Sequence, residues 1–324
     1  MCHMSGSSPE PWNSAGDSLI ATASRVAQPE VMFRASFRLT RSKVIVFAVM
    51  VASYLFAEFS LPGGLIRRFI GDGSDDPGLK IMAEHRGTGF SLILTTANCL
   101  DLTVTVEVPT PNTKASRPTP FTAVIRGQQR MELATYEPLD PTKPWDFKYG
   151  GKWLYGCPGA TPDGTVYLLP YEAATHCKLI QGAHGSYSHQ EGSGHEYAND
   201  WLMPVGTIVL AARGGTAIGV RTDSTVHGVG ERYKNSANYI IIRHSDGTYG
   251  EYLHFQPNAA LVKLGDVVQT GQPIGRSGNS GYTSRPHLHF GVFRIRNDNT
   301  RESLPFKVRT DQGVKDTLEE GQVY

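Results

Sequence analysis

Short runs in which apolar and polar residues alternate, separated by turn signals, dominate the chain from residue 78 onward. In LDLTVTVEV (100–108) the apolar residues alternate with Asp, Thr and Glu, the period-two pattern of a half-buried strand. FSLILTTAN, FTAVI and TVYLLPY are similar runs, and PTPNTKASRPTP and EPLDPTKPWD between them have loop composition. The pattern predicts a mainly β protein whose residues 78–179 form an accessory β-sandwich of about seven strands, with no site chemistry of its own.

The first 66 residues have a different pattern. Residues 1–31 are polar and rich in Ser, Pro and Ala, and 32–43 carry four basic residues, so we expect 1–43 to be a disordered segment ending in a basic n-region. An apolar run follows from Val44 to Ala57 and could extend to residue 66. This layout predicts a signal peptide or a signal anchor over 44–66, with membrane attachment in the second case. The rest of the chain is then exported to the periplasm or the outer face of the cytoplasmic membrane; the rival interpretation of the run is a buried core helix.

Composition narrows the classes of partner and site. The formal net charge is +1, so the chain lacks the basic field of nucleic-acid-binding proteins, and we expect no nucleic acid as partner. None of the four cysteines forms a C-x-x-C pair, which argues against a cysteine-based zinc knuckle. Cys157 and Cys177 could form a disulfide in an oxidising compartment, and two buried thiols are the equal alternative.

Histidines gather in three stretches of the C-terminal part, and HLHF (287–290) is the sharpest of them. On a strand, His287 and His289 point to the same face. Two imidazoles on an apolar strand are costly to bury unless a metal or substrate pairs with them. Asp200, at the end of a predicted strand, supplies a carboxylate, and two imidazoles plus one carboxylate leave a zinc ion one open position, as in a catalytic site. His254 in YLHF is expected on a strand, where it could hydrogen-bond a water or an oxyanion.

From Gln181 to Val292 the chain resembles the lysostaphin/LytM-type family of zinc murein endopeptidases. The resemblance rests on VGTIVLAARGG, LGDVVQTGQPIG and GNSGYTSRPHLHF, together with a His…Asp pair and a histidine in a Y-x-H-L-like segment. It implies that residues 180–324 form an antiparallel β peptidase domain of the barrel-sandwich-hybrid type, holding one Zn²⁺ per chain. PWDFKYGGKW, TVYLLPY and QGAHGSYSH also resemble a subgroup that has an N-terminal β-domain.

The resemblance implies that His189, Asp200 and His289 hold the zinc. It further implies that His287 and His254 are the catalytic histidines, which activate the water and stabilise the tetrahedral intermediate. Here the chain departs from the usual H-x-x-x-D spacing of the family.

The departure concerns the first ligand. Ten residues separate His189 from Asp200, whereas four separate His195 from it. QGAHGSYSH aligns with a longer form of the motif that begins with an SH dipeptide, so we select His189 and keep His195 as the alternate first ligand. The remaining histidines of this part, including His184, His227 and His244, are expected to be exposed.

The resulting hypothesis is a zinc-dependent endopeptidase that cleaves peptide cross-links of peptidoglycan. The alternatives are a catalytically silent protein that binds the wall and regulates other murein hydrolases, and a zinc protease of a protein substrate. LGDVVQTGQPIG also resembles the hairpins of biotinyl or lipoyl carriers, but a carrier has no use for HLHF.

Overall fold

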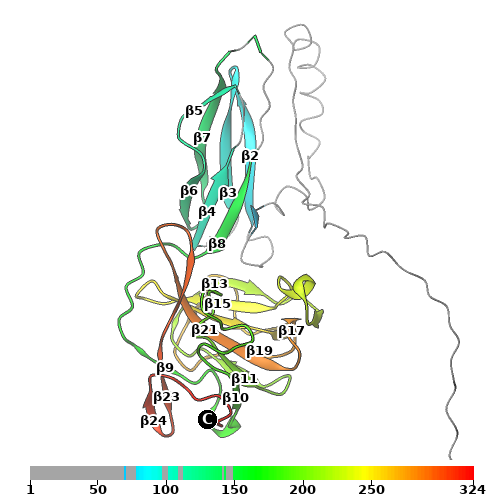
Figure 1. Ribbon diagram of the computed structural model, residues 1–324, viewed down its shortest axis with the longest axis vertical. Helices are drawn as coiled ribbons and strands as arrows, with labels where there is room; N and C mark the ends of the chain where they lie inside the picture. The colour runs from blue at the N-terminus through cyan, green and yellow to red at the C-terminus, as the bar shows by residue number, and fades with distance from the viewer. Residues whose placement is uncertain (1–68, 71–77, 97–100, 109–111, 141, 144–148) are drawn as a thin grey trace, which may run out of the picture. The chain divides into compact units, whose positions relative to one another are not determined.

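The computed structural model describes residues 69–70, 78–96, 101–108, 112–140, 142–143 and 149–324 of the chain (Figure 1). The predicted disordered segment and the predicted signal or anchor helix, residues 1–66, lie outside these residues. Within the described part the structure is mainly β, as predicted, and its helical segments are two single 3₁₀ turns, η2 (Ala173–Thr175) and η3 (Glu231–Tyr233). None of the helices in that part has the length and apolar character to cross a membrane.

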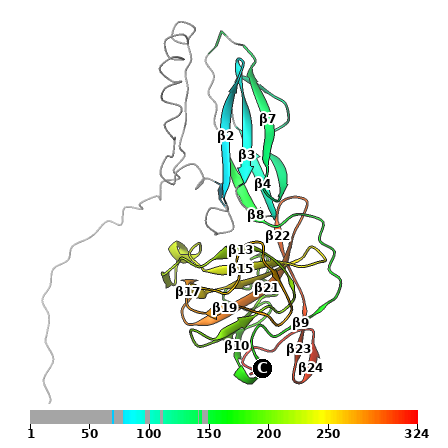
Figure 2. The same ribbon diagram turned by 180° about the vertical axis from the view of Figure 1, so that it is seen from behind.

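Two four-stranded sheets occupy the accessory region (Figure 2). On β4, Leu102, Val104 and Val106 are completely buried, as the alternation predicts, and they share one core with residues of the other sheet such as Leu92 and Leu94. Asp101 and Thr103 on the opposite face are buried as well, so the strand is more than half-buried. A short strand, β5, lies inside a stretch predicted to be a loop. The first sheet has the order β2 (Leu79–Arg86), β3 (Gly89–Thr96), β7 (Arg130–Pro138), β5 (Thr113–Ala115), and the second β1 (Phe69–Ile70), β8 (Gly150–Tyr155), β4 (Asp101–Glu107), β6 (Phe121–Arg126).

An eight-stranded, antiparallel sheet organises the C-terminal region. Its strands, in order, are β10 (Lys178–Gln181), β11 (Asn199–Leu202), β21 (His287–Ile295), β16 (Tyr249–Leu253), β15 (Tyr239–Arg243), β13 (Gly215–Arg221) and β18 (Val267–Val268), with β22 (Arg301–Leu304) also paired to β21. Smaller sheets are formed by β12 (Ile208–Leu210), β19 (Pro273–Ser277) and β17 (Phe255–Ala260), by β14 (His227–Gly228) and β20 (Gly281–Tyr282), and by β24 (Gly313–Lys315), β23 (Lys307–Thr310) and β9 (Val166–Leu168).

β21 is the strand that positions the chemistry. It lies between β11 and β16 and is buried along nearly all of its nine residues. Because side chains alternate along a strand, Leu288 and Phe290 enter the apolar core while His287 and His289 share the other face, as the HLHF pattern predicts. The register sets His289 opposite Asp200 of β11.

Residues 166–179, which the sequence analysis places in the accessory domain, pack against the C-terminal sheets. β9 pairs with β23, β10 pairs with β11, and Tyr167, Cys177 and Leu179 belong to the C-terminal core. Their side chains are therefore buried by the C-terminal sheets. Cys177 and Cys157 are both buried free thiols, so the alternative without a disulfide holds in this structure.

Candidate metal centre

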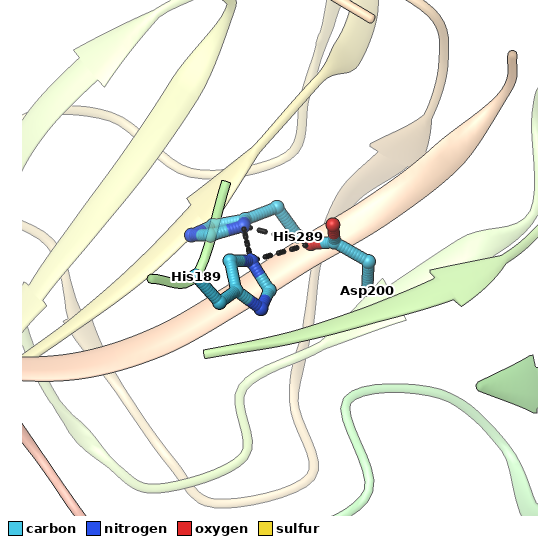
Figure 3. Close-up of side chains that lie close together, drawn as sticks. All are labelled: His189, Asp200 and His289. Atoms are coloured by element: carbon cyan, nitrogen blue, oxygen red, sulfur yellow. Dashed lines mark hydrogen bonds and ion pairs between the residues drawn. The ribbon is translucent and has the colours of Figure 1, made fainter. Parts of the chain in front are cut away.

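Three buried side chains bring one atom each to a common point in the C-terminal region (Figure 3). His289 Nδ1 lies 2.8 Å from Asp200 Oδ1, and His189 Nε2 lies 3.3 Å from His289 Nδ1 and 3.4 Å from Asp200 Oδ1. All three residues are at most 6% exposed. The structure thus brings together the three residues that the sequence comparison selects as ligands.

Each of the three side chains comes from a different segment. His289 is on β21, and Asp200, the second residue of β11, is its register partner, so adjacent strands set this pair. His189 lies in the segment between β10 and β11, outside any strand. Its Nδ1–H donates to the carbonyl of Gly182 at 3.0 Å, so in the neutral ring Nε2 carries no proton, and Nε2 is turned towards the other two side chains.

The spacing of these three atoms fits a zinc ion. Tetrahedral zinc with bonds of about 2.0–2.1 Å to nitrogen and oxygen places its ligand atoms about 3.3–3.4 Å apart. Two of the observed separations, 3.3 and 3.4 Å, have this value. The backbone carbonyl on His189 is also the outer partner that metal-bound imidazoles usually have. Although burial opposes ionisation, the neighbouring histidines hold the pKa of Asp200 well below its usual range, so the carboxylate is charged.

His195, the alternate first ligand, lies on the opposite side of the His289 ring. His195 Nδ1 and His289 Nε2 are 3.6 and 3.8 Å from Glu251 Oε2. Arg301 holds Glu251 with two hydrogen bonds of 2.9 and 2.6 Å, and its guanidinium is 3.4 Å from His195. Although burial opposes it, this guanidinium lowers the pKa of Glu251 to about 2. A cation between His195 and Glu251 would meet the Arg301 charge, so the geometry favours the group that contains His189.

Glu251 and Arg301 were missed by the sequence analysis. Glu251 stands in the middle of YGEYL, the buried strand β16 next to the histidines, and a carboxylate at such a position is a signal for a functional residue. Arg301 carried no such signal, because its role depends on the pairing of β22 with β21.

His287 and His254 lie side by side next to these three residues, with ring centroids 4.3 Å apart. His287 Nδ1–H donates to the carbonyl of Arg285 at 2.8 Å and His254 Nδ1–H to the carbonyl of Ser280 at 2.7 Å, which leaves Nε2 of both rings able to accept a proton. Burial lowers the pKa of both, that of His254 to about 3, so both imidazoles are neutral near pH 7. His287 Nε2 is 4.0 Å from Asp200 Oδ2.

The prediction that His254 stands on a strand is wrong. It lies between β16 and β17 with φ at +72°, a left-handed conformation that is uncommon outside glycine. The carbonyl of Asn238 accepts hydrogen bonds from the backbone N–H of both His254 and Phe255, at 2.9 and 3.3 Å. The chain leaves the large sheet at this residue, and alternation along a sequence does not show such a break.

Of the three histidines predicted to be exposed, one is buried. His184 and His227 are exposed, as predicted, but His244 is only 2% exposed. Its Nδ1–H donates to the carbonyl of Gly214 at 2.9 Å, and burial lowers its pKa to about 4. A hydrogen bond to a backbone carbonyl offsets the cost of burying this neutral ring, and the loop that provides it is remote in sequence.

Residues 194–303 match the family model described as peptidase family M23. The peptidoglycan DD-endopeptidase ShyA of Vibrio cholerae is 35% identical over 91 residues, which cover 28% of this chain and 18% of the relative. The glycyl-glycine endopeptidase ALE-1 of Staphylococcus capitis is 33% identical over 137 residues, 41% of this chain and 35% of the relative. The solved catalytic domain of lysostaphin from Staphylococcus simulans shares 28% identity over 41% of this chain and 94% of that domain, with a TM-score of 0.29.

The chain therefore spans between 18% and 35% of the length of these two curated relatives. The matched segment contains Asp200, His254, His287 and His289, whereas His189 precedes it by five residues. Residues 194–303 of this chain are accordingly a domain of peptidase family M23.

Proposed function

We propose that this protein is a zinc-dependent endopeptidase that hydrolyses peptide cross-links of cell-wall peptidoglycan. The observation that carries the proposal is the convergence of His189 Nε2, Asp200 Oδ1 and His289 Nδ1 within 3.4 Å, beside two neutral histidines. Two relatives are named as endopeptidases, one of them for peptidoglycan. The names of these two relatives specify different peptide bonds. The relatives therefore support the substrate class that we propose, and experiment has to identify the bond that is cleaved.

His189, Asp200 and His289 would hold the zinc, which lowers the pKa of a bound water towards about 7 and polarises a carbonyl. The chain's own contribution is proton movement at two defined atoms, Nε2 of His287 and Nε2 of His254. Because Nδ1 of each ring is committed to a backbone carbonyl, Nε2 is the position that takes the proton of the attacking water and returns it to the leaving amine.

The proposal includes an envelope location and a division of labour along the chain. The basic-then-apolar segment that ends at residue 66 would export or anchor the protein, on the side of the membrane where peptidoglycan lies. The two four-stranded sheets would form an accessory β-sandwich. The eight-stranded sheet and the smaller sheets of the C-terminal region would form a peptidase domain of the barrel-sandwich-hybrid type. The packing of two sheets around one core supports the first assignment, and the M23 match supports the second.

The test combines metal analysis with digestion of purified peptidoglycan. We expect the purified protein to carry one zinc per chain and to release peptides whose new ends mass spectrometry can identify, which also gives the bond. His289→Ala should lose both zinc and release. His227→Ala, at an exposed histidine of the same region, is the matched control and should keep both.

Two results would count against the proposal. Full peptide release by His289→Ala would overturn the metal mechanism. Stoichiometric zinc without any release from peptidoglycan would favour the wall-binding regulator over the enzyme.

A further inference from the structure

Gln181 is a buried polar residue next to the candidate ligands and outside the segment that matches the M23 family. It is the last residue of β10, is 6% exposed, and pairs with Asp200 in the register of β10 and β11. The family match begins at residue 194, so neither Gln181 nor His189 is part of it. The contacts of Gln181 therefore show how this chain positions His189, the candidate ligand that lies outside the family match.

All four hydrogen-bonding positions of the Gln181 amide are used. Oε1 accepts from the backbone N–H of Tyr187 and of Ser188, both at 3.0 Å. Nε2 donates to Asp200 Oδ2 at 2.9 Å and to Ser188 Oγ at 2.8 Å. Because two backbone donors require the oxygen on their side, the NH₂ group has to face Asp200.

These contacts act on two of the candidate ligands, Asp200 and His189. The bond to Oδ2 fixes the rotation of the Asp200 carboxylate, and the other oxygen, Oδ1, is the one that faces His289 and His189. The bonds to Tyr187 and Ser188 fix the backbone immediately before His189.

The residues around Gln181 complete this arrangement. The carbonyl of the next residue, Gly182, accepts from His189 Nδ1, so consecutive residues hold the two ligands. Gly185 closes over Gln181, and a Cβ there would overlap the Gln181 side chain. The loop is thus built around the Gln181 amide.

The spacing of the ligands explains why such a contact is required. Ten residues separate His189, in the segment between β10 and β11, from Asp200 on β11, and local geometry does not bring two ligands so separated together. We propose that Gln181 is a positioning residue of the zinc centre: it orients the Asp200 carboxylate and holds the loop so that His189 meets it. This inference rests on the proposed function, since it concerns affinity for the same metal.

Zinc affinity of the metal-free protein, measured by competition with a chromophoric chelator, tests this role without measuring catalysis. Gln181→Met keeps the length of the side chain and removes its hydrogen bonds; we expect the Kd for zinc to rise about 10- to 100-fold, the usual effect of losing an outer partner of a metal ligand. Gln190→Met is the matched control, because this exposed amide of the same loop bonds only the Ser186 carbonyl among the hydrogen bonds of the described residues; its Kd should stay within about twofold.

Gln181→Asn guards against a failure of the methionine variant to fold. It keeps the amide but withdraws it by one methylene group, and we expect at least about a 10-fold rise in the zinc Kd. The visible spectrum of the cobalt-loaded variants should also change from that of the cobalt-loaded wild type, since the ligand set or its geometry is altered; a merely structural role would leave that spectrum as it is.

The outcomes separate this inference from the proposed function. Wild-type zinc affinity and an unchanged cobalt spectrum in folded Gln181→Met or Gln181→Asn would overturn the role of Gln181 and leave the proposed function standing. Absence of zinc binding by the wild type would overturn the proposed function and this inference with it. Loss of affinity in the Gln181 variants alone, with Gln190→Met unaffected, supports the inference.

Discussion

The accessory sheets and the large C-terminal sheet are built from the same kind of strand, but they treat ionisable residues differently. In the accessory region Arg86 pairs with Glu132 and Arg130 with Glu84 at the exposed surface, and Asp101, at 4% exposure, is the one acidic or basic side chain buried among the described residues there. The C-terminal region instead buries eight His, Asp, Glu and Arg side chains at 8% exposure or less; they are His189, Asp200, Arg213, His244, Glu251, His254, His287 and His289.

The difference shows where the chain accepts the cost of burying ionisable groups. Removing such groups from water costs several kcal/mol unless hydrogen bonds, opposite charges or a metal compensate for it. The accessory region accepts this cost at Asp101 alone among its described residues, whereas six of the buried ionisable residues of the C-terminal region, three of them drawn in Figure 3, lie on or beside β21. If this contrast is functional, substitutions in the two regions should have separable effects, on chemistry in one and on stability in the other.

The largest effect is expected at His287. His287→Ala removes the Nε2 that accepts a proton, so peptide hydrolysis should fall about 10²- to 10⁴-fold, the usual contribution of a general acid or base. Zinc content should be unchanged, since His287 is outside the group formed by His189, Asp200 and His289. Rates on a defined peptide and zinc content of the same sample check both statements. Zinc loss in proportion to activity would make His287 a ligand and contradict its assignment.

The second effect belongs to the accessory core. Leu92 is completely buried on β3, so Leu92→Ala should lower the free energy of unfolding by about 2–5 kcal/mol through lost burial and the cavity left behind. The zinc Kd should not change. Leu139→Ala is the control, because Leu139 is 65% exposed, and its effect should be within about 0.5 kcal/mol. Chemical denaturation followed by circular dichroism measures both variants.

How far the sequence predicts the structure differs between the same two regions. Period-two alternation predicted β4 and the burial of its apolar residues, but not the burial of Asp101 and Thr103 on the other face. The HLHF pattern likewise predicted that His287 and His289 share a face, since this follows from strand geometry alone. These features are local, and a local pattern can specify them.

Other features of the site depend on contacts between distant segments. The choice of His189 over His195 rested on resemblance, and the structure adds a physical reason: the Arg301 guanidinium next to His195 disfavours a cation there. Arg301 reaches His195 only through the pairing of β22 with β21, which the sequence does not show. The turn at His254 depends on the Asn238 carbonyl, and the burial of His244 on the Gly214 carbonyl. No periodicity in the sequence records such partners, so the predictions for both histidines were wrong.

A third effect should depend on pH and not involve the metal. Asp246 accepts hydrogen bonds from Arg213 and from Thr248, and although burial opposes them, these partners lower its pKa to about 2. A carboxyl whose pKa is lowered on folding stabilises the protein above its unfolded pKa of about 3.9, and the stabilisation is lost as the pH falls towards 2. The Tm of Asp246→Asn should therefore be below that of the wild type at pH 5 to 7, and the gap should narrow from pH 4 to pH 2.

The pH series should be measured on protein kept metal-free by a chelator, because acid also releases metal from histidine ligands. A gap in Tm that is the same at pH 2 and pH 7 would contradict the assignment of the lowered pKa to Asp246. The ion pair between Arg213 and Asp246 lies outside the metal centre. The pH series therefore tests whether buried charge in the C-terminal region also stabilises the fold.

The smallest effect is expected at the surface of the accessory sheets. Arg86 and Glu132 are 3.2 Å apart, with side chains 63% and 46% exposed, so water and salt screen their attraction. A double-mutant cycle with Arg86→Ala and Glu132→Ala should give a coupling free energy below about 1 kcal/mol that declines further in high salt. A coupling above about 2 kcal/mol would mean that the accessory region also relies on charge, and the contrast between the two regions would fail. Arg86 on β2 lies one strand away from Leu92 on β3, so the two measurements together separate surface charge from core packing within one sheet.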